Sequence, residues 1–518
     1  MPSSLTNSHA MRRQRTCVLL TLLTLLVVGS PTLVAGPKGK QEVSQSASPR
    51  PNPQIAKWIS QLNSDRFKVR DQATQALVKA GSEALPAVLK ATLSKLPEVR
   101  NRAFGVLAAI SESSDTPTSN AALRAAEKIS QSPDRQRAAK ATQIVESVEQ
   151  KAIRYFRSTE RNVSAHPKYR QKRQLVLRGK ITDADWRQLV KLRTFKTLWL
   201  HSKEATDADL ARLNGLDKLV TLDLFSSTRI TGPGLVHLAH LPALRSLALP
   251  KGFPASGLRY LKDLDGLTEL SIHYTSFKDD AGGLAHLKEL DGLERLTISS
   301  TDILDAALAP LAKLTRLKSL NLWNNEKMSD AGLVHLKNLK RLETVSLPYR
   351  IRGAGLKHLT GAKRLQTLSL IGNRISEEGL RHIGQMSNLE SLNLSWTLFN
   401  DAGFAHLRGL TVLKKLDLQG SAVTDAGLAH LKKLKALERL DIDSTKITDA
   451  GLAHLAELQN LHWLNVQRTS ISDAAVPHLQ KMKNLRFLNP IDTRLTERGK
   501  KTLRKALPKL IIDIDAPP

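Results

Sequence analysis

Residues 437–458 read LERLDIDSTKITDAGLAHLAEL, and this stretch recurs in altered form from about Arg173 to about Leu510. It opens with the pattern L-x-x-L-x-L, which places alternate side chains of an extended strand on one face. After a turn, Thr448 suits a helix N-cap and precedes the run DAGLAHL. Self-similarity at a fixed period outweighs other clues to architecture, so a repeat protein is predicted.

Each unit is predicted to contain one strand and one short helix, and neither can bury its apolar face alone. Leu452, Leu455 and Leu458 are three residues apart, as a buried helical stripe requires. Stacking the units in register would join their apolar faces into one continuous core. We expect fourteen units, with strands near residues 175, 198, 222, 247, 270, 296, 320, 345, 368, 392, 416, 440, 464 and 488.

These motifs resemble those of the leucine-rich repeat family. The ITDAGL variant is similar to the ribonuclease-inhibitor and F-box-associated subtype, which also occurs in exported bacterial proteins. The resemblance covers about two thirds of the chain, residues 173–518. It implies an α/β fold in which a right-handed, horseshoe-shaped solenoid carries a parallel sheet on its concave face. It also implies a binding role, because the family is defined by architecture and not by one activity.

The segment before the repeats is divided by composition. Arg12, Arg13 and Arg15 precede the short apolar run 18–28, so residues 1–35 are predicted to be a signal peptide that exports the protein. An uncleaved membrane anchor is the alternative. The Pro- and Ser-rich residues 36–53 are predicted to be a flexible linker. Cys17 is the only cysteine, which excludes an intrachain disulfide and a zinc-thiolate site.

Residues 54–157 show apolar positions at helical spacing and are predicted to form a small all-α region. The stretches DRFKVRDQATQAL and LPEVRNRAFGVL share a Val-Arg pair followed by an Ala-rich face. This resembles HEAT-type helical repeats. The alternative is a helical bundle that caps the solenoid. Residues 158–172 are predicted to be a basic connector.

A histidine recurs at the same position of many repeat units. Because one imidazole per repeat forms a line and does not converge on a point, we expect these residues to be structural and predict no metal site. A line of imidazoles that would charge together near about pH 6 is the alternative. The residues are His237, His286, His335, His358, His382, His406, His430, His454 and His478.

An aspartate column marks the predicted helix starts. A carboxylate there is favoured by the positive end of the helix dipole, so we expect a structural role and not calcium binding. Lysine and arginine gather between each helix end and the next strand, which predicts one basic edge on the solenoid. The aspartates are Asp183, Asp207, Asp305, Asp330, Asp401, Asp425, Asp449 and Asp473.

The outward strand positions are the predicted contacts for a protein partner. Aromatic side chains there are typical interface anchors. The charges on this face nearly cancel, which disfavours nucleic acid as the ligand. The predicted partner-binding residues are Trp199, His201, Phe225, His273, Arg295, Trp323, Asn393, Asp417, Arg439, Asp441, Asp443 and Trp463.

The formal charge of +30 keeps a second hypothesis open, that of an adhesin for acidic polysaccharide or another polyanion or anionic surface. Residues 154–180 are rich in basic groups with aromatic residues between them, and with the basic edge they would form its site. The basic residues of this hypothesis are Arg154, Arg157, Arg161, Lys168, Arg170, Lys172 and Arg173.

Catalytic motifs are missing from the sequence, which contains no GxSxG, no HExxH and no phosphate-binding loop ending in GK[ST]. We therefore predict a non-enzymatic binding scaffold without a cofactor. A substrate receptor of the F-box ubiquitin-ligase type is the third hypothesis. The repeat subtype permits it, but no F-box is apparent and the predicted export argues against it.

Overall fold

The computed structural model describes residues 52–159, 174–278, 282–399 and 401–512. The segment from Gln54 onward forms one compact unit. The predicted signal peptide, nearly all of the linker and most of the basic connector lie outside the described residues.

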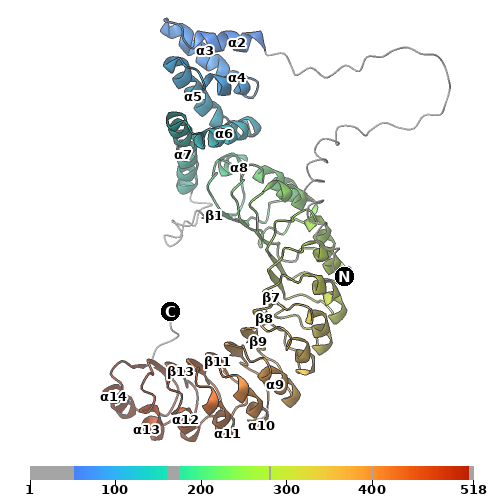
Figure 1. Ribbon diagram of the computed structural model, residues 1–518, viewed down its shortest axis with the longest axis vertical. Helices are drawn as coiled ribbons and strands as arrows, with labels where there is room; N and C mark the ends of the chain where they lie inside the picture. The colour runs from blue at the N-terminus through green and yellow to red at the C-terminus, as the bar shows by residue number, and fades with distance from the viewer. Residues whose placement is uncertain (1–51, 160–173, 279–281, 400, 513–518) are drawn as a thin grey trace, which may run out of the picture. The chain divides into compact units, whose positions relative to one another are not determined.

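An all-helical region comes first (Figure 1). Its core contains Leu77 and Leu107, which are fully buried. The arginines of the two Val-Arg pairs have equivalent roles, because Arg70 donates to the carbonyl of Ser64 and Arg100 to that of Ser94. The assignment to HEAT-type repeats stays a prediction. The helices are α2 (Pro53–Gln61), α3 (Phe67–Ala80), α4 (Leu85–Ala91), α5 (Pro97–Ser111), α6 (Thr116–Ser130) and α7 (Arg135–Ser158).

A single parallel sheet of fifteen strands follows, and its strands pair in the order of the sequence. A strand lies at each of the fourteen predicted positions, and β15 adds one more. The strands are β1 (Gln174–Arg178), β2 (Thr197–His201), β3 (Thr221–Asp223), β4 (Ser246–Ala248), β5 (Glu269–His273), β6 (Arg295–Ser299), β7 (Ser319–Asn321), β8 (Thr344–Ser346), β9 (Thr367–Ser369), β10 (Ser391–Asn393), β11 (Lys415–Asp417), β12 (Arg439–Asp441), β13 (Trp463–Asn465), β14 (Phe487–Asn489) and β15 (Ile511–Ile512).

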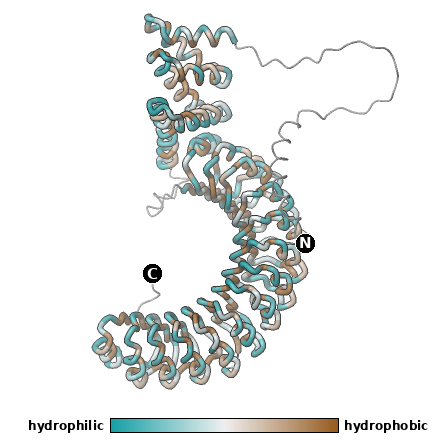
Figure 2. Tube along the Cα trace, in the orientation of Figure 1, coloured by the Kyte–Doolittle hydropathy of each residue, from teal (hydrophilic) through white to brown (hydrophobic). Residues whose placement is uncertain are grey.

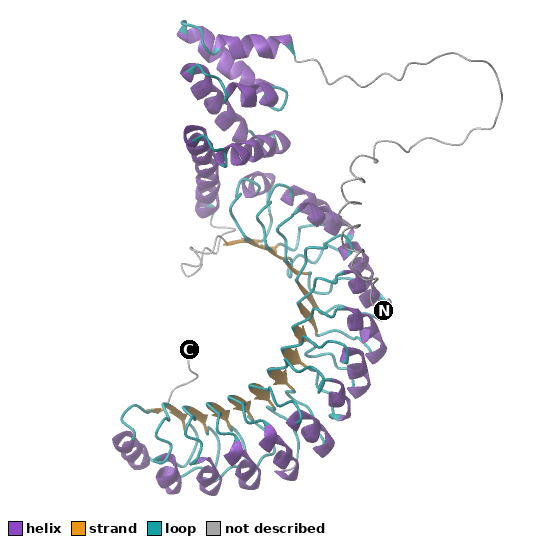
Figure 3. Cartoon of the chain, viewed as in Figure 1, coloured by secondary structure: helices purple, strands orange, loops and turns teal. Residues whose placement is uncertain are grey.

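Short helical segments connect the strands. Many are 3-10 helices, labelled η, whose three-residue turn matches the leucine spacing. In the repeats, the strands line the concave side and the helical segments the opposite side (Figure 3). The segments are α8 (Asp183–Leu189), η2 (Asp207–Leu213), η3 (Pro233–His240), η4 (Ala255–Leu261), η5 (Gly283–Glu289), η6 (Asp305–Lys313), η7 (Asp330–Leu336), η8 (Ala354–His358), α9 (Glu377–Gly384), α10 (Asp401–Phe404), η9 (Ala405–Gly409), α11 (Asp425–Leu428), η10 (Ala429–Lys433), α12 (Asp449–Leu455), η11 (Asp473–Ala475), α13 (Val476–Leu479) and α14 (Glu497–Ala506).

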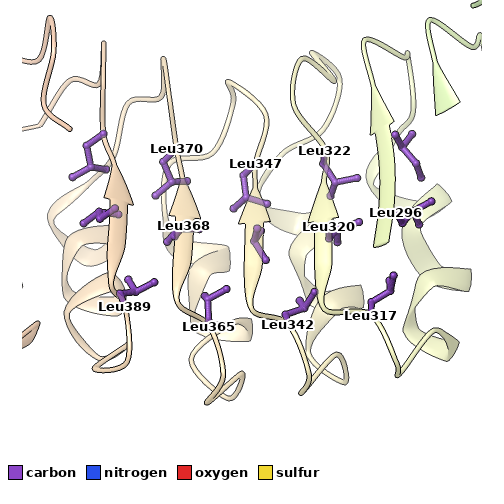
Figure 4. Close-up of a cluster of buried hydrophobic side chains, with 14 of the residues drawn as sticks. Leu296, Leu317, Leu320, Leu322, Leu342, Leu347, Leu365, Leu368, Leu370 and Leu389 are labelled. Atoms are coloured by element: carbon purple, nitrogen blue, oxygen red, sulfur yellow. The ribbon is translucent and has the colours of Figure 1, made fainter. Parts of the chain in front are cut away.

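The core is a set of parallel leucine rows between the sheet and the helical segments. Leu322, Leu347 and Leu370 lie side by side in one such row, and Leu320 and Leu368 belong to the row beside it (Figure 4). Apolar and polar positions recur along every repeat (Figure 2). The predicted α/β solenoid with a helical region before it is therefore confirmed.

The aspartate column joins neighbouring repeats, a role that the helix-dipole argument did not include. The carboxylate of Asp425 accepts hydrogen bonds from the backbone N–H and the hydroxyl of Thr448 in the next repeat, at 2.8 and 2.6 Å. Asp207 accepts four such bonds, from the backbone N–H groups of Thr231, Gly232 and Gly234 and the Thr231 hydroxyl. Each bonded aspartate therefore caps the following unit.

An ion cluster around a buried arginine connects the helical region to the first repeats. Arg193 is 1% exposed, and its guanidinium donates two hydrogen bonds to Glu127 of α6 and one to Asp217. The Glu149 carboxylate of α7 accepts from the backbone N–H and the hydroxyl of Thr194. Because these bonds cross from helix to repeat, the helical region covers the N-terminal end of the solenoid core.

Candidate functional site

The in-register sheet aligns the predicted partner-binding residues in columns on its outward face. Trp199 pairs with Asp223 across β2 and β3, and Arg439 pairs with Trp463 across β12 and β13. Neighbouring strands lie about 4.8 Å apart, so residues of one column are close enough to contact.

The N-terminal part of this face brings four predicted residues together. The rings of Trp199 and His201 stack with their centroids 6.4 Å apart, and Phe225 meets His273 edge to face at 5.7 Å. His201 Nε2 lies 3.3 Å from Asp223 Oδ1. Burial opposes ionisation of Asp223, but His201 and the Phe225 N–H outweigh it and hold the pKa of this carboxyl below its ordinary value. Burial lowers the pKa of His273.

The middle of the face carries exposed aromatic groups. Trp323 is 40% exposed and meets Tyr349 edge to face at 5.8 Å. Tyr274, which is 49% exposed, lies beneath the ammonium of Lys251, 4.3 Å from its ring centroid. Arg295 pairs with Glu269 at 3.1 Å. This part of the sheet therefore presents aromatic faces to solvent, as an interface anchor requires.

Tyr274, Tyr349 and Trp396 are absent from the predicted set. Tyr274 and Trp396 occupy the turn position two residues after the last apolar residue of the L-x-x-L-x-L pattern, Ile272 or Leu394, with backbone φ of 57° and 56°. Glycine fills the same position at Gly372 and Gly420, because a positive φ favours a residue without a side chain. A bulky aromatic residue at the position that other repeats fill with glycine is thus the sequence signal that could have identified Tyr274 and Trp396.

One row of residues in the C-terminal part of the face is polar and acidic. Asn393, Asp417, Asp441 and Asn465 follow one another on β10, β11, β12 and β13. Asn393 donates to Asp417 at 3.2 Å, and Asn465 donates to Asp441 at 3.1 Å. Burial raises the pKa of Asp441 to about 6, and the charges of Asp417 and Asp443 act in the same direction, against hydrogen bonds from the Asp443 N–H and Asn465.

Replacing Asp441 with asparagine is expected to raise the free energy of unfolding by about 2 kcal/mol at pH 8. Because the folded-state pKa is raised, the ionised carboxylate destabilises the fold above pH 6, and this cost disappears as pH falls through about 6 toward 4. The gain should therefore shrink over the same range. Urea unfolding at several pH values measures it, and a variant no more stable than wild type at pH 8 would contradict the expectation.

Asp443 corrects the predicted set. Strand alternation placed it outward, but it is 2% exposed and cannot contact a partner directly. Its carboxylate accepts from Gln419 at 2.7 Å and from the Ser444 hydroxyl at 2.9 Å, and it pairs with Arg468. Neighbouring repeats thus cover Asp443, which has a structural role. Close by, the Arg439 guanidinium lies 4.7 Å from the Trp463 ring centroid.

The structure places only part of the predicted polyanion site. Arg154 and Arg157 lie in the last turns of α7. The remaining residues of that hypothesis, Arg161, Lys168, Arg170, Lys172 and Arg173, lie outside the described residues.

The histidine column lies on the helical side of the repeats. His382 Nε2 is 3.4 Å from Glu378, and His406 Nε2 is 3.5 Å from Glu377. Burial lowers the pKa of His358, and neighbouring lysines act in the same direction. Within the described ranges, no group of three or more His, Cys, Asp or Glu side chains is arranged to hold a metal ion.

Known proteins of similar structure come from several organisms. An internalin from Listeria monocytogenes is 22% identical, with 62% of this chain and 88% of that chain covered and a TM-score of 0.46. A leucine-rich-repeat protein from Leptospira interrogans is 17% identical, with 65% and 99% covered and a TM-score of 0.37. The ectodomain of a plant receptor kinase from Arabidopsis thaliana is 14% identical, with 65% and 52% covered and a TM-score of 0.32. No curated protein is significantly similar in sequence.

Two family models match the repeats. Residues 149–406 match one described as a leucine-rich repeat region, and residues 409–432 match one described as a leucine-rich repeat. The strand-and-helix unit of the structure is the one that this family is built from, and its parallel sheet runs through both matched segments. These segments of the chain belong to the leucine-rich repeat family.

Proposed function

We propose that this protein is an exported, non-enzymatic scaffold that binds another protein through the concave face of its solenoid. The observation that carries the proposal is the set of exposed aromatic side chains on or beside the outward strand positions. Tyr274, Trp323 and Trp396 are 49%, 40% and 55% exposed. Large aromatic groups that are half exposed on a rigid sheet are typical anchors of protein interfaces.

The composition of the face supports a protein ligand over a polyanion. Arg295 is already paired with Glu269, and Arg439 lies against Trp463. The aspartates Asp223, Asp417 and Asp441 would repel a polyanion from the same surface. The lysine-rich edge also contains ion pairs, such as Lys414 with Glu390 at 2.8 Å.

Export is part of the proposal and is supported by the order of basic, apolar and small residues in the first 35 positions. Over the stretches that the structure describes, no helix is both long and apolar enough to cross a membrane.

The triple variant Tyr274→Ala, Trp323→Ala and Trp396→Ala is expected to lose at least tenfold in affinity for the partner while remaining folded, because the three side chains are already exposed. The measurement is capture of proteins from envelope and culture-medium fractions of the producing organism by the immobilised chain. The matched control is Leu304→Ala with Val412→Ala, which removes side chains of similar exposure, 55% and 41%, that lie outside the strands.

The salt dependence of binding distinguishes a protein ligand from a polyanion. Binding to a polyanion falls steeply between 50 and 200 mM salt, by roughly a thousandfold or more for six or more contacts. Aromatic-anchored binding should change little over that range. Unchanged capture by the triple variant, or a steep loss with salt alone, would reject the concave-face proposal.

A further inference from the structure

One edge of the solenoid carries a basic patch that extends over three consecutive repeats. It lies in the segments that lead into β7, β8 and β9, which are residues 313–318, 337–343 and 359–366. Glu343 is the only acidic residue in these segments. The exposed cations of the basic patch are Lys313, Arg316, Lys337, Lys340, Arg341, Lys363 and Arg364.

Helix dipoles account for only two of these seven cations. Lys313 is the last residue of η6 and Lys337 follows the end of η7, where the negative end of a helix favours a positive charge. The other five lie beyond the last turns of η6, η7 and η8. The dipole effect is confined to the last turn, so these five need another explanation.

Three of the five form an arginine row. Arg316, Arg341 and Arg364 occupy the same position before β7, β8 and β9, whose strands pair in register. The leucines that follow them lie side by side at the starts of these strands (Figure 4), where neighbouring backbones are about 4.8 Å apart. The repeats on either side have Gly292 and Asn388 at this position. Like charges at such spacing repel one another, so the fold gains nothing from the row.

The arginine row has no counter-ion within the molecule. Among the described residues, its three guanidiniums form no ion pair within 4 Å and no hydrogen bond. The carboxylates near both ends of the row are already bonded. Lys318 donates to Glu294 at 2.8 Å, and Lys414 donates to Glu390 at the same distance. The positive charge of the row is therefore available to a ligand.

A hollow of about 440 Å³ adjoins the last arginine of the row. The residues around it include Glu343, Lys363, Arg364, Gln366, Asn388 and Glu390. This lining combines cationic donors, neutral amides and carboxylate acceptors. A ligand that matches it carries anionic groups and also hydroxyl groups that can donate to a carboxylate.

Nucleic acid and membrane surfaces match the basic patch less well. Single-stranded nucleic acid is bound on aromatic side chains that stack with the bases, and the three segments contain no aromatic residue. A DNA backbone also has no hydroxyl donor for Glu343. Helices that bind at a membrane surface add an apolar face to the basic one, but the leucines of these segments are buried.

We infer that the basic patch binds an acidic polysaccharide, whose sulfate or carboxylate groups lie along the arginine row and whose hydroxyl groups reach the hollow. A guanidinium can bond such an anion through two parallel donors, a geometry that lysine does not offer. The patch precedes the strands and is separate from the outward strand positions of the concave face. The inference thus goes beyond the proposed function, because the protein would hold a polymer at its edge and a protein on its concave face.

Calorimetric titration of the full-length protein with heparin, a sulfated polysaccharide, tests this inference. At about 150 mM salt, removing three bidentate contacts is expected to weaken binding at least tenfold. The slope of log K against log salt should also become shallower by about two to three, roughly one per arginine removed. The variant carries Arg316→Gln, Arg341→Gln and Arg364→Gln.

The matched control makes the same change of net charge at the other end of the strands. Its three arginines are exposed and follow β3, β8 and β9, whereas those of the row precede their strands. The control should bind heparin nearly as tightly as wild type, with an unchanged salt slope. It carries Arg229→Gln, Arg350→Gln and Arg374→Gln.

Equal loss of heparin binding in the two arginine variants, both folded by circular dichroism, would show that net charge alone decides it and would overturn the inference. Tighter binding of a short DNA duplex or of phosphatidylglycerol vesicles than of heparin, at the same salt, would overturn the choice of ligand. The proposed function fails separately. The aromatic triple variant should bind heparin like wild type, and the row variant should capture the protein partner like wild type.

Discussion

Replacing Arg193 with alanine is expected to lower the free energy of unfolding by about 3–5 kcal/mol. The guanidinium is 1% exposed and satisfies Glu127 and Asp217 at 2.8 and 2.9 Å. Removing it leaves Glu127 without its cation and Asp217 with only the exposed Arg124, so two partly buried carboxylates lose the charge that compensates them. Because Glu127 belongs to α6 and Asp217 to the repeats, the loss should loosen the helical region from the solenoid.

Urea unfolding followed by circular dichroism measures the change, and hydrogen exchange should show faster exchange in α6 and α7. The control is Arg124→Ala, since Arg124 bonds the same Asp217 at 3.3 Å but is 47% exposed. An exposed ion pair contributes about 0–1 kcal/mol. Equal effects of the two substitutions would show that burial does not determine the strength of this junction.

Replacing Asp207 with alanine is expected to lower the free energy of unfolding by about 2–3 kcal/mol, because three backbone N–H groups and one hydroxyl lose their acceptor. Burial opposes ionisation of Asp207, but these bonds outweigh it and hold its pKa below the ordinary value. The stabilisation is therefore fully present above about pH 5 and is lost as pH falls below about 4.

Thermal and urea unfolding of both proteins between pH 3 and 7 tests the amount and its pH dependence. Asp183→Ala is the control within the same column. Asp183 is 72% exposed and pairs only with Arg212 among the bonds of its carboxylate in the described residues. No measurable change in stability is expected for it, because an exposed ion pair contributes little. A difference between wild type and Asp207→Ala that stays constant down to pH 3 would exclude the ionised carboxylate as the cause.

The strands and the core were predictable because the repeat supplies the same evidence many times. Leu437, Leu440 and Ile442 indicate a strand, and their counterparts in other units fix its position to within a residue or two. The final strand was not predictable, since Ile511–Ile512 is two residues long and lacks the full motif. The junction at Arg193 was not predictable either, because its partners are 66 and 24 residues away.

The candidate site was predictable as a face and only partly as a set of residues. Alternation along a strand correctly puts Asp441 outward, but it ends where the turn begins. The alternation rule therefore places Asp443 wrongly, because side chains from neighbouring repeats cover it. The alternation rule also misses Tyr274 and Trp396. These residues lie beyond the last strand residue, where a left-handed backbone conformation turns their side chains outward.

The bonds of the aspartate column run in one direction along the chain. The Asp425 carboxylate accepts from Thr448, that of Asp449 from Ser472 and that of Asp473 from Thr496, so each of these consecutive units provides an acceptor for the unit that follows it. If one whole unit of this series were deleted or duplicated, the units that became neighbours would again have one aspartate carboxylate facing the N–H and hydroxyl groups that it accepts from. The array can thus change in length by complete repeats, and with it the reach of the concave face, without creating an unmatched joint.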